Sequence, residues 1–224
     1  MVKESWLERL ARNLDVAGGE DLRHEIMQGS ENLSSGSSPA AKSRWVKAML
    51  ARLEEHFEEP QRLDIMSACS CAFSQTLIRQ FREAYVKGGN LEDLLEAMRA
   101  EQRADILRRL GADESLHQLV EVEPFMHSPQ LCEDGSILHT GRPYHPREYL
   151  LAPEEQLRRQ HMCHCGWING SRENISPTFC GCGTGFYQIL WQSLIDQPVE
   201  VEVVSTIFSG GDYCQMRVRL PAAS

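Results

Sequence analysis

Closely spaced cysteine pairs recur along this chain, and they constrain what it can fold into more than any other feature. The three Cys-x-Cys pairs are Cys69-Ser70-Cys71, Cys163-His164-Cys165 and Cys180-Gly181-Cys182. Cys214 follows in a predicted strand, so of the eight cysteines only Cys132 stands apart. Thiols placed this closely indicate a metal site, a redox centre or a nucleophilic site, and the sequence leaves these three open.

The composition is that of an ordinary soluble globular protein, with 42% hydrophobic and 25% charged residues among 224. No apolar run reaches the roughly 18 residues that span a bilayer, and the N-terminus has no apolar signal-peptide block. We therefore expect a cytoplasmic protein with no membrane partner. In a reducing cytoplasm, cysteines serve as ligands or reactive groups more often than as crosslinks. The net charge of −9 argues against a nucleic-acid partner.

Apolar residues at helical spacing predict a helical N-terminal half. The predicted helices are residues 4–27, with a break at Gly18-Gly19, then 41–57, 62–85 and 91–110. A Ser/Gly-rich stretch over residues 29–39 predicts a flexible linker. We therefore expect residues 1–40 to form a helical extension and linker, and residues 41–224 to form a single domain.

The first cysteine pair, Cys69 and Cys71, falls inside the predicted helix 62–85. Residues two apart in an unbroken helix point about 200° apart, so both thiols could not hold one ion. One thiol alone joins a cluster, or Ser67 to Ser70 marks a break between helices, or both thiols are core cysteines. These readings stay open.

Prolines interrupt residues 112–160, which predicts loops and short edge strands, with strands at 119–122 and 149–151. Three histidines in this stretch, His127, His139 and His145, are expected to be exposed. Tyr144 and Tyr149 are weaker candidates for lining a pocket.

The C-terminal pattern is clearer. It predicts a helix over residues 185–196 capped by Thr184, then a hairpin of strands 199–207 and 213–220 around Ser209-Gly210-Gly211-Asp212. A turn centred on the two glycines pairs Ile207 with Cys214 and Glu202 with Arg219, and puts Cys214 on the buried face. The predicted fold class is α+β, with N-terminal helices packed on a small antiparallel sheet that ends in a C-terminal helix and β-hairpin.

The cysteine-rich block, residues 161–221, carries the predicted site. Four thiolates within twenty residues match the ligand number of tetrahedral zinc, although zinc ribbons prefer a two-residue gap. The predicted ligands to zinc or another soft metal are Cys163, Cys165, Cys180, Cys182 and Cys214, with Cys69 and Cys71. Either His161 or His164 can replace a thiol. Core packing is the commonest role for aromatics such as Trp167, Tyr187 and Trp191, but here they would also wall a site for a small apolar ligand.

A hydrolase is the alternative interpretation. Cys180 or Cys182 would be the nucleophile at a helix N-terminus, His161 or His164 the base, and the amides of 181–185 the oxyanion donors. A third interpretation is a partner-binding scaffold whose cysteines merely pack. The helical half can pack on its own sheet or on a second subunit, so a homodimer also stays open.

The order of these elements resembles a known family. A Cys pair is followed by a Cys pair opening a helix, the strand Gln197-Pro198-Val199-Glu200-Val201-Glu202-Val203-Val204, and Gly211-Asp212-Tyr213-Cys214-Gln215-Met216-Arg217-Val218. Over about the last sixty residues the chain resembles vinyl-reductase-type ligand-binding domains and the related aminothiazoline carboxylate hydrolase-like proteins, in an uncharacterised branch with Cys-x-Cys pairs. The resemblance implies an α+β fold and small-molecule sensing, partner tethering or opening of a cyclic amidine. It also implies roles for Cys163, Cys165, Cys180, Cys182 and Cys214.

Overall fold

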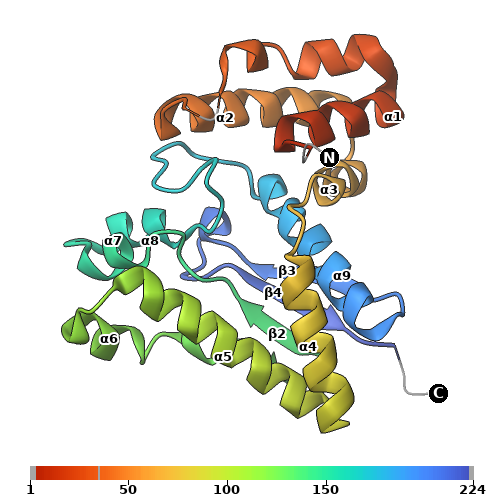
Figure 1. Ribbon diagram of the computed structural model, residues 1–224. Helices are drawn as coiled ribbons and strands as arrows, with labels where there is room; N and C mark the ends of the chain where they lie inside the picture. The colour runs from red at the N-terminus through yellow and green to blue at the C-terminus, as the bar shows by residue number, and fades with distance from the viewer. Residues whose placement is uncertain (1–3, 35, 222–224) are drawn as a thin grey trace.

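A computed structural model describes residues 4–34 and 36–221 and gives an α+β architecture, as predicted (Figure 1). The helices are α1 (Trp6–Ile26), α2 (Pro39–His56), α3 (Glu59–Ala68), α4 (Gln75–Gly88), α5 (Leu91–Leu110), α6 (Glu114–Val120), α7 (Pro146–Leu151), α8 (Glu155–Met162) and α9 (Gly181–Ile195). Short 3-10 turns are η1 (Ser30–Asn32), η2 (Pro124–His127), η3 (Pro177–Cys180) and η4 (Ile207–Ser209). The strands are β1 (Gln130–Leu131), β2 (Ile137–Thr140), β3 (Glu200–Ser205) and β4 (Gln215–Arg219).

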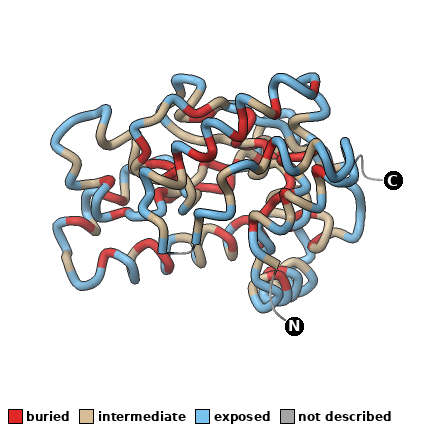
Figure 2. Tube along the Cα trace, turned by 90° about the horizontal axis from the view of Figure 1, so that it is seen from above, coloured by how far each residue is buried: buried red, intermediate tan, exposed pale blue. Residues whose placement is uncertain are grey.

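The strands form one antiparallel sheet in the order β1-β2-β4-β3. Helices α4, α5 and α9 share a hydrophobic core with it, in which Ile137 and Val218 of the sheet meet Trp191 of α9. The sheet therefore has a helical cover, and Figure 2 shows the buried positions concentrated along the middle of the molecule. The same strands carry Glu200, Glu202 and Arg219 as exposed residues.

Helices α1 and α2 form a layer at the top of Figure 1, and α3 lies below them, in contact with both α1 and α9. Ser5 and Glu8 make a capping box that starts α1, and Gly19 breaks its helical geometry at φ 83°, where the sequence predicted a break. Leu10 and Leu14 are fully buried, so the predicted N-terminal extension packs into this layer. Residues 1–3 and Ser35 of that extension lie outside the described residues.

The predicted helix 62–85 is in fact two helices. It ends as α3 at Ala68 and resumes as α4 after Ser74, whose side chain accepts a hydrogen bond from the Leu77 amide. Cys69 and Cys71 lie in the break, which is one of the alternatives that the sequence left open. Helix α3 then runs very close to α9, because a Cβ atom on Gly185 would fall 2.0 Å from the carbonyl oxygen of Ser67.

The middle of the chain departs most from prediction. The strand predicted at 119–122 is wrong, because Leu119 and Val120 end α6, and the strand predicted at 149–151 is wrong, because those residues belong to α7. Both segments are short and apolar, and periodicity alone does not separate helix from strand at that length. His139, expected to be exposed, is buried on β2.

The C-terminal helix begins four residues before its predicted start, so Thr184 lies inside α9 and donates to the Gly181 carbonyl instead of capping it. The hairpin register also differs: Glu202 pairs with Arg217 and Val203 with Met216, because η4 and a bulge lengthen the turn. Over residues 200–203 the shift is two residues, which preserves the inward and outward faces. At the bulge Ser205 pairs with Gln215 instead of the predicted Met216, a shift of one. Glu202 still contacts Arg219 diagonally, at 3.1 Å between Oε1 and Nη2.

None of the helices in the described residues has both the length and the apolar character needed to cross a membrane.

Candidate functional site

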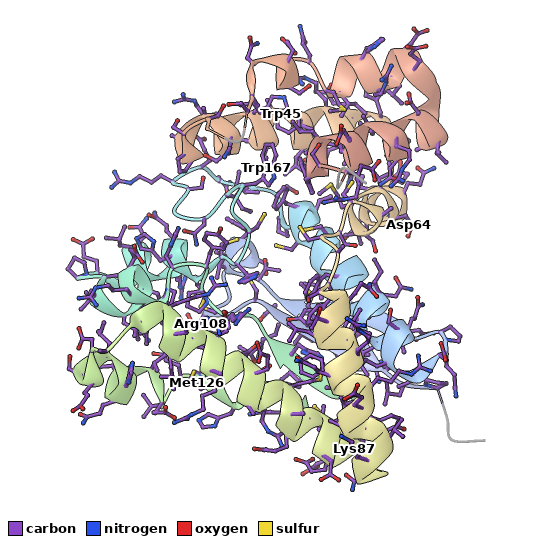
Figure 3. The ribbon with its side chains drawn as sticks, in the orientation of Figure 1. Trp45, Asp64, Lys87, Arg108, Met126 and Trp167 are labelled. Atoms are coloured by element: carbon purple, nitrogen blue, oxygen red, sulfur yellow. The ribbon has the colours of Figure 1, made fainter. Side chains whose placement is uncertain are left out.

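Four distant chain segments bring seven of the cysteines into one region. Cys69 and Cys71 come from the α3–α4 break, Cys163 and Cys165 from the loop after α8, and the other three from the start of α9 and the start of β4. Figure 3 shows sulfur atoms below Trp167, between its loop and the N-terminal end of α9. All the cysteines are free thiols, and Cys132 takes no part in this cluster.

The closest relationship in the cluster joins Cys180 to Cys214. A hydrogen bond between the two side chains raises the pKa of Cys180 well above its usual range, and burial raises it further. The same bond lowers the pKa of Cys214, against burial, and the Ile207 amide donates a second hydrogen bond to that sulfur. Cys214 is therefore the thiol best placed to carry the negative charge, with Cys180 as its proton donor.

The remaining thiols arrange themselves around this pair. The pKa of Cys163 is raised mainly by burial, and further by the charges of Cys165, Cys214 and Cys182. The pKa of Cys182 is likewise raised mainly by burial, and further by the charges of Cys165 and Cys71. We call Cys163, Cys180 and Cys214 the Cys214 group, and Cys71, Cys165 and Cys182, with Cys69 at its edge, the Cys182 group.

Each Cys-x-Cys pair in the C-terminal block has one thiol in each group, although Cys163 has Cys165, and Cys180 has Cys182, among its charged neighbours. Cys163 belongs with Cys214. The pKa of Cys165 is raised to about 11, mainly by burial; the Trp167 amide opposes this rise and Cys71 adds to it. Cys180 contacts Cys214, whereas Cys182, two residues later in the first turn of α9, belongs to the other group. A single-residue spacing in curved backbone splays the side chains, which is why neither pair acts as a clamp on its own.

Surrounding protein desolvates these thiols, yet most of them keep contact with solvent. Cys165, Cys180, Cys182 and Cys214 are all partly exposed, although burial raises the pKa of the first three and opposes the lowering at Cys214. These four thiols thus lie just beneath the surface of the protein.

Tyr187 of α9 adds a polar group to the neighbourhood of the thiols. Burial raises its pKa to about 12, while Arg142 and Cys214 are its charged neighbours. Its ring lies over His139, with centroids 4.2 Å apart, and the tyrosine remains partly exposed. Tyr187 therefore has both a thiol of the cluster and a cationic side chain among its neighbours, and we call the group around Arg142 the cationic end of the site.

That cationic end is built on Asp105 of α5. Its nearly buried carboxylate pairs with Arg108, Arg109 and Arg142, and the Arg109 Nε lies 2.9 Å from Oδ2. Gly141, next to Arg142, donates its amide to the Cys214 carbonyl at 2.7 Å, which ties this end to β4. No sequence signal pointed to the whole group, because Arg142 is 37 residues from Asp105 and no motif joins them.

The predicted base, His164, faces this cationic end instead of a thiol. Its Nδ1 lies 3.2 Å from the Arg142 carbonyl oxygen. Its pKa is lowered to about 4, mainly by desolvation and further by the positive charges of Arg142 and Arg109. The residue nevertheless has an exposed surface. His164 is therefore neutral near pH 7.

The predicted ligand-binding aromatics occupy three different environments. Trp167 packs on Trp6, with centroids 4.9 Å apart, in the layer of α1 and α2. Trp191 is fully buried, and its Nε1 donates to His139 Nε2 at 2.8 Å. Of the three, Tyr187 is the one whose charged neighbours include a thiol of the cluster.

No group of three or more Cys, His, Asp or Glu side chains within residues 4–34 and 36–221 is arranged to hold a metal ion as it stands. The donor chemistry nevertheless fits a soft metal, because thiolates prefer zinc and copper(I). The side chains of the Cys214 group would have to turn toward a common point.

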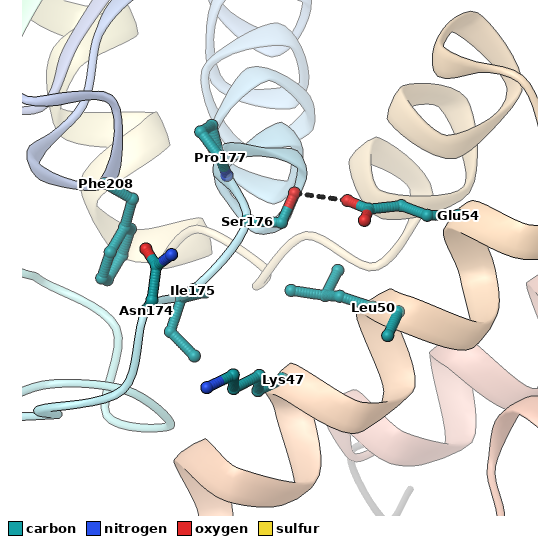
Figure 4. A pocket seen from close by; sticks show the side chains of 9 residues that line it. Lys47, Leu50, Glu54, Asn174, Ile175, Ser176, Pro177 and Phe208 are labelled. Atoms are coloured by element: carbon teal, nitrogen blue, oxygen red, sulfur yellow. Dashed lines mark hydrogen bonds between the residues drawn. The ribbon is translucent and has the colours of Figure 1, made fainter.

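A separate pocket of ≈ 440 Å³ lies away from the thiols, between α2 and residues 174–177 (Figure 4). Leu50, Ile175 and Phe208 give it an apolar lining, and Ser176 Oγ donates to Glu54 Oε1 at 2.6 Å across it. It contains no cysteine and is widely open to solvent, so the thiol cluster, with its ionisable side chains, remains the better candidate for chemistry.

No family model matches the chain, and neither a curated protein nor a solved structure does.

Proposed function

We propose that this protein binds a soft metal ion, with zinc as the first choice, through the Cys214 group, beside a site that accepts a small molecule. The observation that carries the proposal is the convergence of seven thiols from four separate segments. Packing alone does not require so many thiols in partial contact with solvent.

In this proposal Cys163, Cys180 and Cys214 supply the ligands. A thiol must lose its proton to bind a metal, and Cys214, whose pKa is lowered, is the natural first ligand. When bound, the metal would provide Lewis acidity and a crosslink between α9 and β4. Tyr187 would then orient a small molecule next to it through its hydroxyl group.

Cobalt(II) tests this proposal, because thiolate ligation of cobalt gives a charge-transfer absorption and zinc displaces it. The full chain, kept reduced with a non-thiol reductant, should bind about one equivalent. Cys214→Ser should weaken binding by at least about tenfold, since even second-shell changes at metal sites cost that much. Cys132→Ser, which removes a thiol outside the cluster, should bind as the wild type does. The proposal is lost if cobalt gives no thiolate absorption or if the two variants behave alike.

A cysteine-dependent hydrolase acting on a small cyclic C–N substrate is the second candidate, and the lowered pKa of Cys214 favours it. The raised pKa values of Cys180 and Cys182 make them weaker nucleophiles near neutral pH than the sequence suggested. Cys214 would attack, and Cys180 would hold the proton.

Alkylation with iodoacetamide separates the two functions. A hydrolase would be metal-free and would label first at Cys214, with a pH midpoint below the usual thiol range. Labelling that is equally slow at every cysteine of the metal-free chain would remove this candidate.

A further inference from the structure

A second pocket, of ≈ 230 Å³, lies between α8, the loop 168–174 and η4. It adjoins the pocket of Figure 4, because Asn174 and Phe208 line both of them. None of its described lining residues is a cysteine, and neither the metal proposal nor the hydrolase alternative uses it. Pockets for drug-sized ligands have about 300–1,000 Å³, so this one suits a smaller molecule.

Hydrogen bonds hold the walls of this pocket in place. Gln156, Arg159 and Gln160 share one face of α8, because residues three and four apart are neighbours on a helix. The Gly170 amide donates to the Gln160 carbonyl at 2.9 Å, which ties the loop to the helix. A capping box fixes η4, which carries Phe208. The pocket is therefore formed by the protein's own contacts.

Part of the lining is apolar. Ile168 is buried, and Ile207 and Phe208 are partly buried in the same hydrophobic core. Side chains of this kind pack against an aliphatic or aromatic group, so the body of a ligand in this pocket is expected to be apolar.

The charged residues of the lining leave one cation without an opposite charge. Asp212 pairs with Arg159 at 2.6 Å. Glu173, the acidic residue of the lining, pairs with Lys47 at 3.2 Å. Arg172 is exposed and has neither an ion pair nor a hydrogen bond in the described part of the chain. One free guanidinium matches a carboxylate better than a phosphate monoester, whose charge is about −1.5 to −2 near pH 7.

Two buried polar atoms of the lining also lack a hydrogen-bond partner among the described residues. They are Nε of Arg159 and Oε1 of Gln160. A buried polar atom without a partner costs free energy, which a ligand that supplies the partner would recover. Nε is a donor and suits a carboxylate oxygen, whereas Oε1 is an acceptor and needs a hydroxyl or ammonium group.

We propose that this pocket binds a small organic carboxylate that has an apolar body and a hydroxyl or ammonium group. Arg172 pairs with the carboxylate, Gln160 accepts from the hydroxyl or ammonium group, and Phe208 packs on the apolar body. Hydroxy acids and free amino acids with apolar side chains belong to this class. The site does not rest on the metal proposal, because its lining includes none of the proposed metal ligands.

Three related probes test the class of ligand by calorimetry on the full chain with a chelator present. Phenyllactate has both polar groups, phenylpropanoate lacks the hydroxyl, and phenylpropanediol lacks the carboxylate. Phenyllactate should bind at least about tenfold more tightly than either, since a hydrogen bond to a charged group is worth that factor. The proposal is overturned if phenyllactate does not bind, or if either of the other probes binds as tightly.

Variants of the lining test the two polar roles. Arg172→Gln should weaken phenyllactate binding by about tenfold and leave phenylpropanediol unaffected. It should fold normally, because the side chain is exposed and makes no ion pair or hydrogen bond among the described residues. Arg79→Gln removes another exposed arginine, from α4, and should bind as the wild type does. Equal losses in these two variants would overturn the role of Arg172.

Gln160→Met removes the acceptor Oε1 and keeps the length of the side chain. It should abolish the preference for phenyllactate over phenylpropanoate without weakening phenylpropanoate. A preference that survives would overturn the role of Gln160. The probe series on the wild type decides this point if Gln160→Met does not fold.

Amide chemical shifts locate the bound probe. Shift changes on adding phenyllactate should fall in residues 156–160, 168–174 and 207–208. Changes confined to the α2 side of the pocket in Figure 4, or to the thiol loop 163–165, would overturn the assignment. Phenyllactate can bind when cobalt does not, and cobalt when phenyllactate does not, so the failure of either proposal leaves the other standing.

Discussion

Trp191 donates its indole N–H to Nε2 of His139 over 2.8 Å, in the core between α9 and β2. The hydrogen bond requires Nε2 to be an acceptor, so the proton of the neutral imidazole is on Nδ1. Burial lowers the pKa of His139 to about 3, and the Tyr187 ring covers its face. A neutral histidine therefore connects the sheet to the helix that carries the candidate site.

This arrangement predicts a pH-dependent stability. The unfolded chain protonates His139 below about pH 6.5, whereas the folded chain does not until about pH 3. The free energy of unfolding should therefore fall as the pH drops from 6.5 toward 3, by about 1.4 kcal/mol per unit. Urea unfolding between pH 7.5 and 5 measures this slope.

The variant His139→Gln should flatten that slope, and His127→Gln, at an exposed position, should leave it unchanged. His164, whose pKa is also lowered, keeps part of the slope in both variants. Equal slopes for wild type and His139→Gln would contradict the assignment.

Asp105→Asn should lower the free energy of unfolding, because Asp105 holds the arginines of the cationic end together. The change leaves Arg108, Arg109 and Arg142 facing one another around a neutral amide. We expect a loss of about 2 kcal/mol, as for a hydrogen-bonded charge. Added salt should recover part of it, because ions screen repulsion between like charges.

Asp113→Asn is the matched control for Asp105→Asn. Asp113 pairs with Arg147 at 3.3 Å on the surface, where such pairs contribute roughly 0.2–1 kcal/mol. Chemical denaturation compares the two variants, and equal losses would argue against a special role for Asp105.

Gly185→Ala should separate α3 from α9. The new Cβ would meet the backbone oxygen of Ser67 at 2.0 Å, and backbone cannot turn aside. We expect a loss of about 1–3 kcal/mol, the usual cost of overpacking. Gly183→Ala in the same helix meets only the Cε atom of Met216, so it should cost less. Thermal melts of the two variants give the comparison, and similar melting temperatures would refute the close approach.

Metal affinity, if the proposed function holds, should rise with pH. Cys163 and Cys180 have raised pKa values, so both are protonated at neutral pH and must release their protons to bind a metal. Zinc titration by calorimetry in buffers of different ionisation enthalpy counts the released protons. A binding constant independent of pH between 6 and 8 would exclude these two thiols as ligands.

Helices and their breaks could be predicted where the local sequence pattern was strong. The fifth helix, α5, has the predicted bounds of 91–110, and Gly19 breaks α1 where the glycine pair suggested. The predicted faces were correct on β4, where Met216 and Val218 are buried, because a two-residue slip leaves alternation intact. On β3, Val203 was expected to be buried but is exposed. The register itself depended on η4, whose residues carry no strong turn signal before Gly210.

The candidate site could be predicted only in part. The Cys-x-Cys pairs indicated which thiols lie near one another, but not how the two members of each pair would be placed. The roles of Arg142 and His139 were missed, since neither stands in a motif and their partners, Asp105 and Trp191, are 37 and 52 residues away. Contacts at such separations depend on how the sheet and helices pack, which local sequence does not encode.

Because the loop at 163–165 and the start of α9 each supply a thiol to both groups, the two groups are not independent. A metal ion that reorients Cys163 and Cys180 must also reorient Cys165 and Cys182, because a single residue separates the members of each pair. Binding at the Cys214 group should therefore change the affinity of the Cys182 group, and binding at the Cys182 group should change the affinity of the Cys214 group by the same factor.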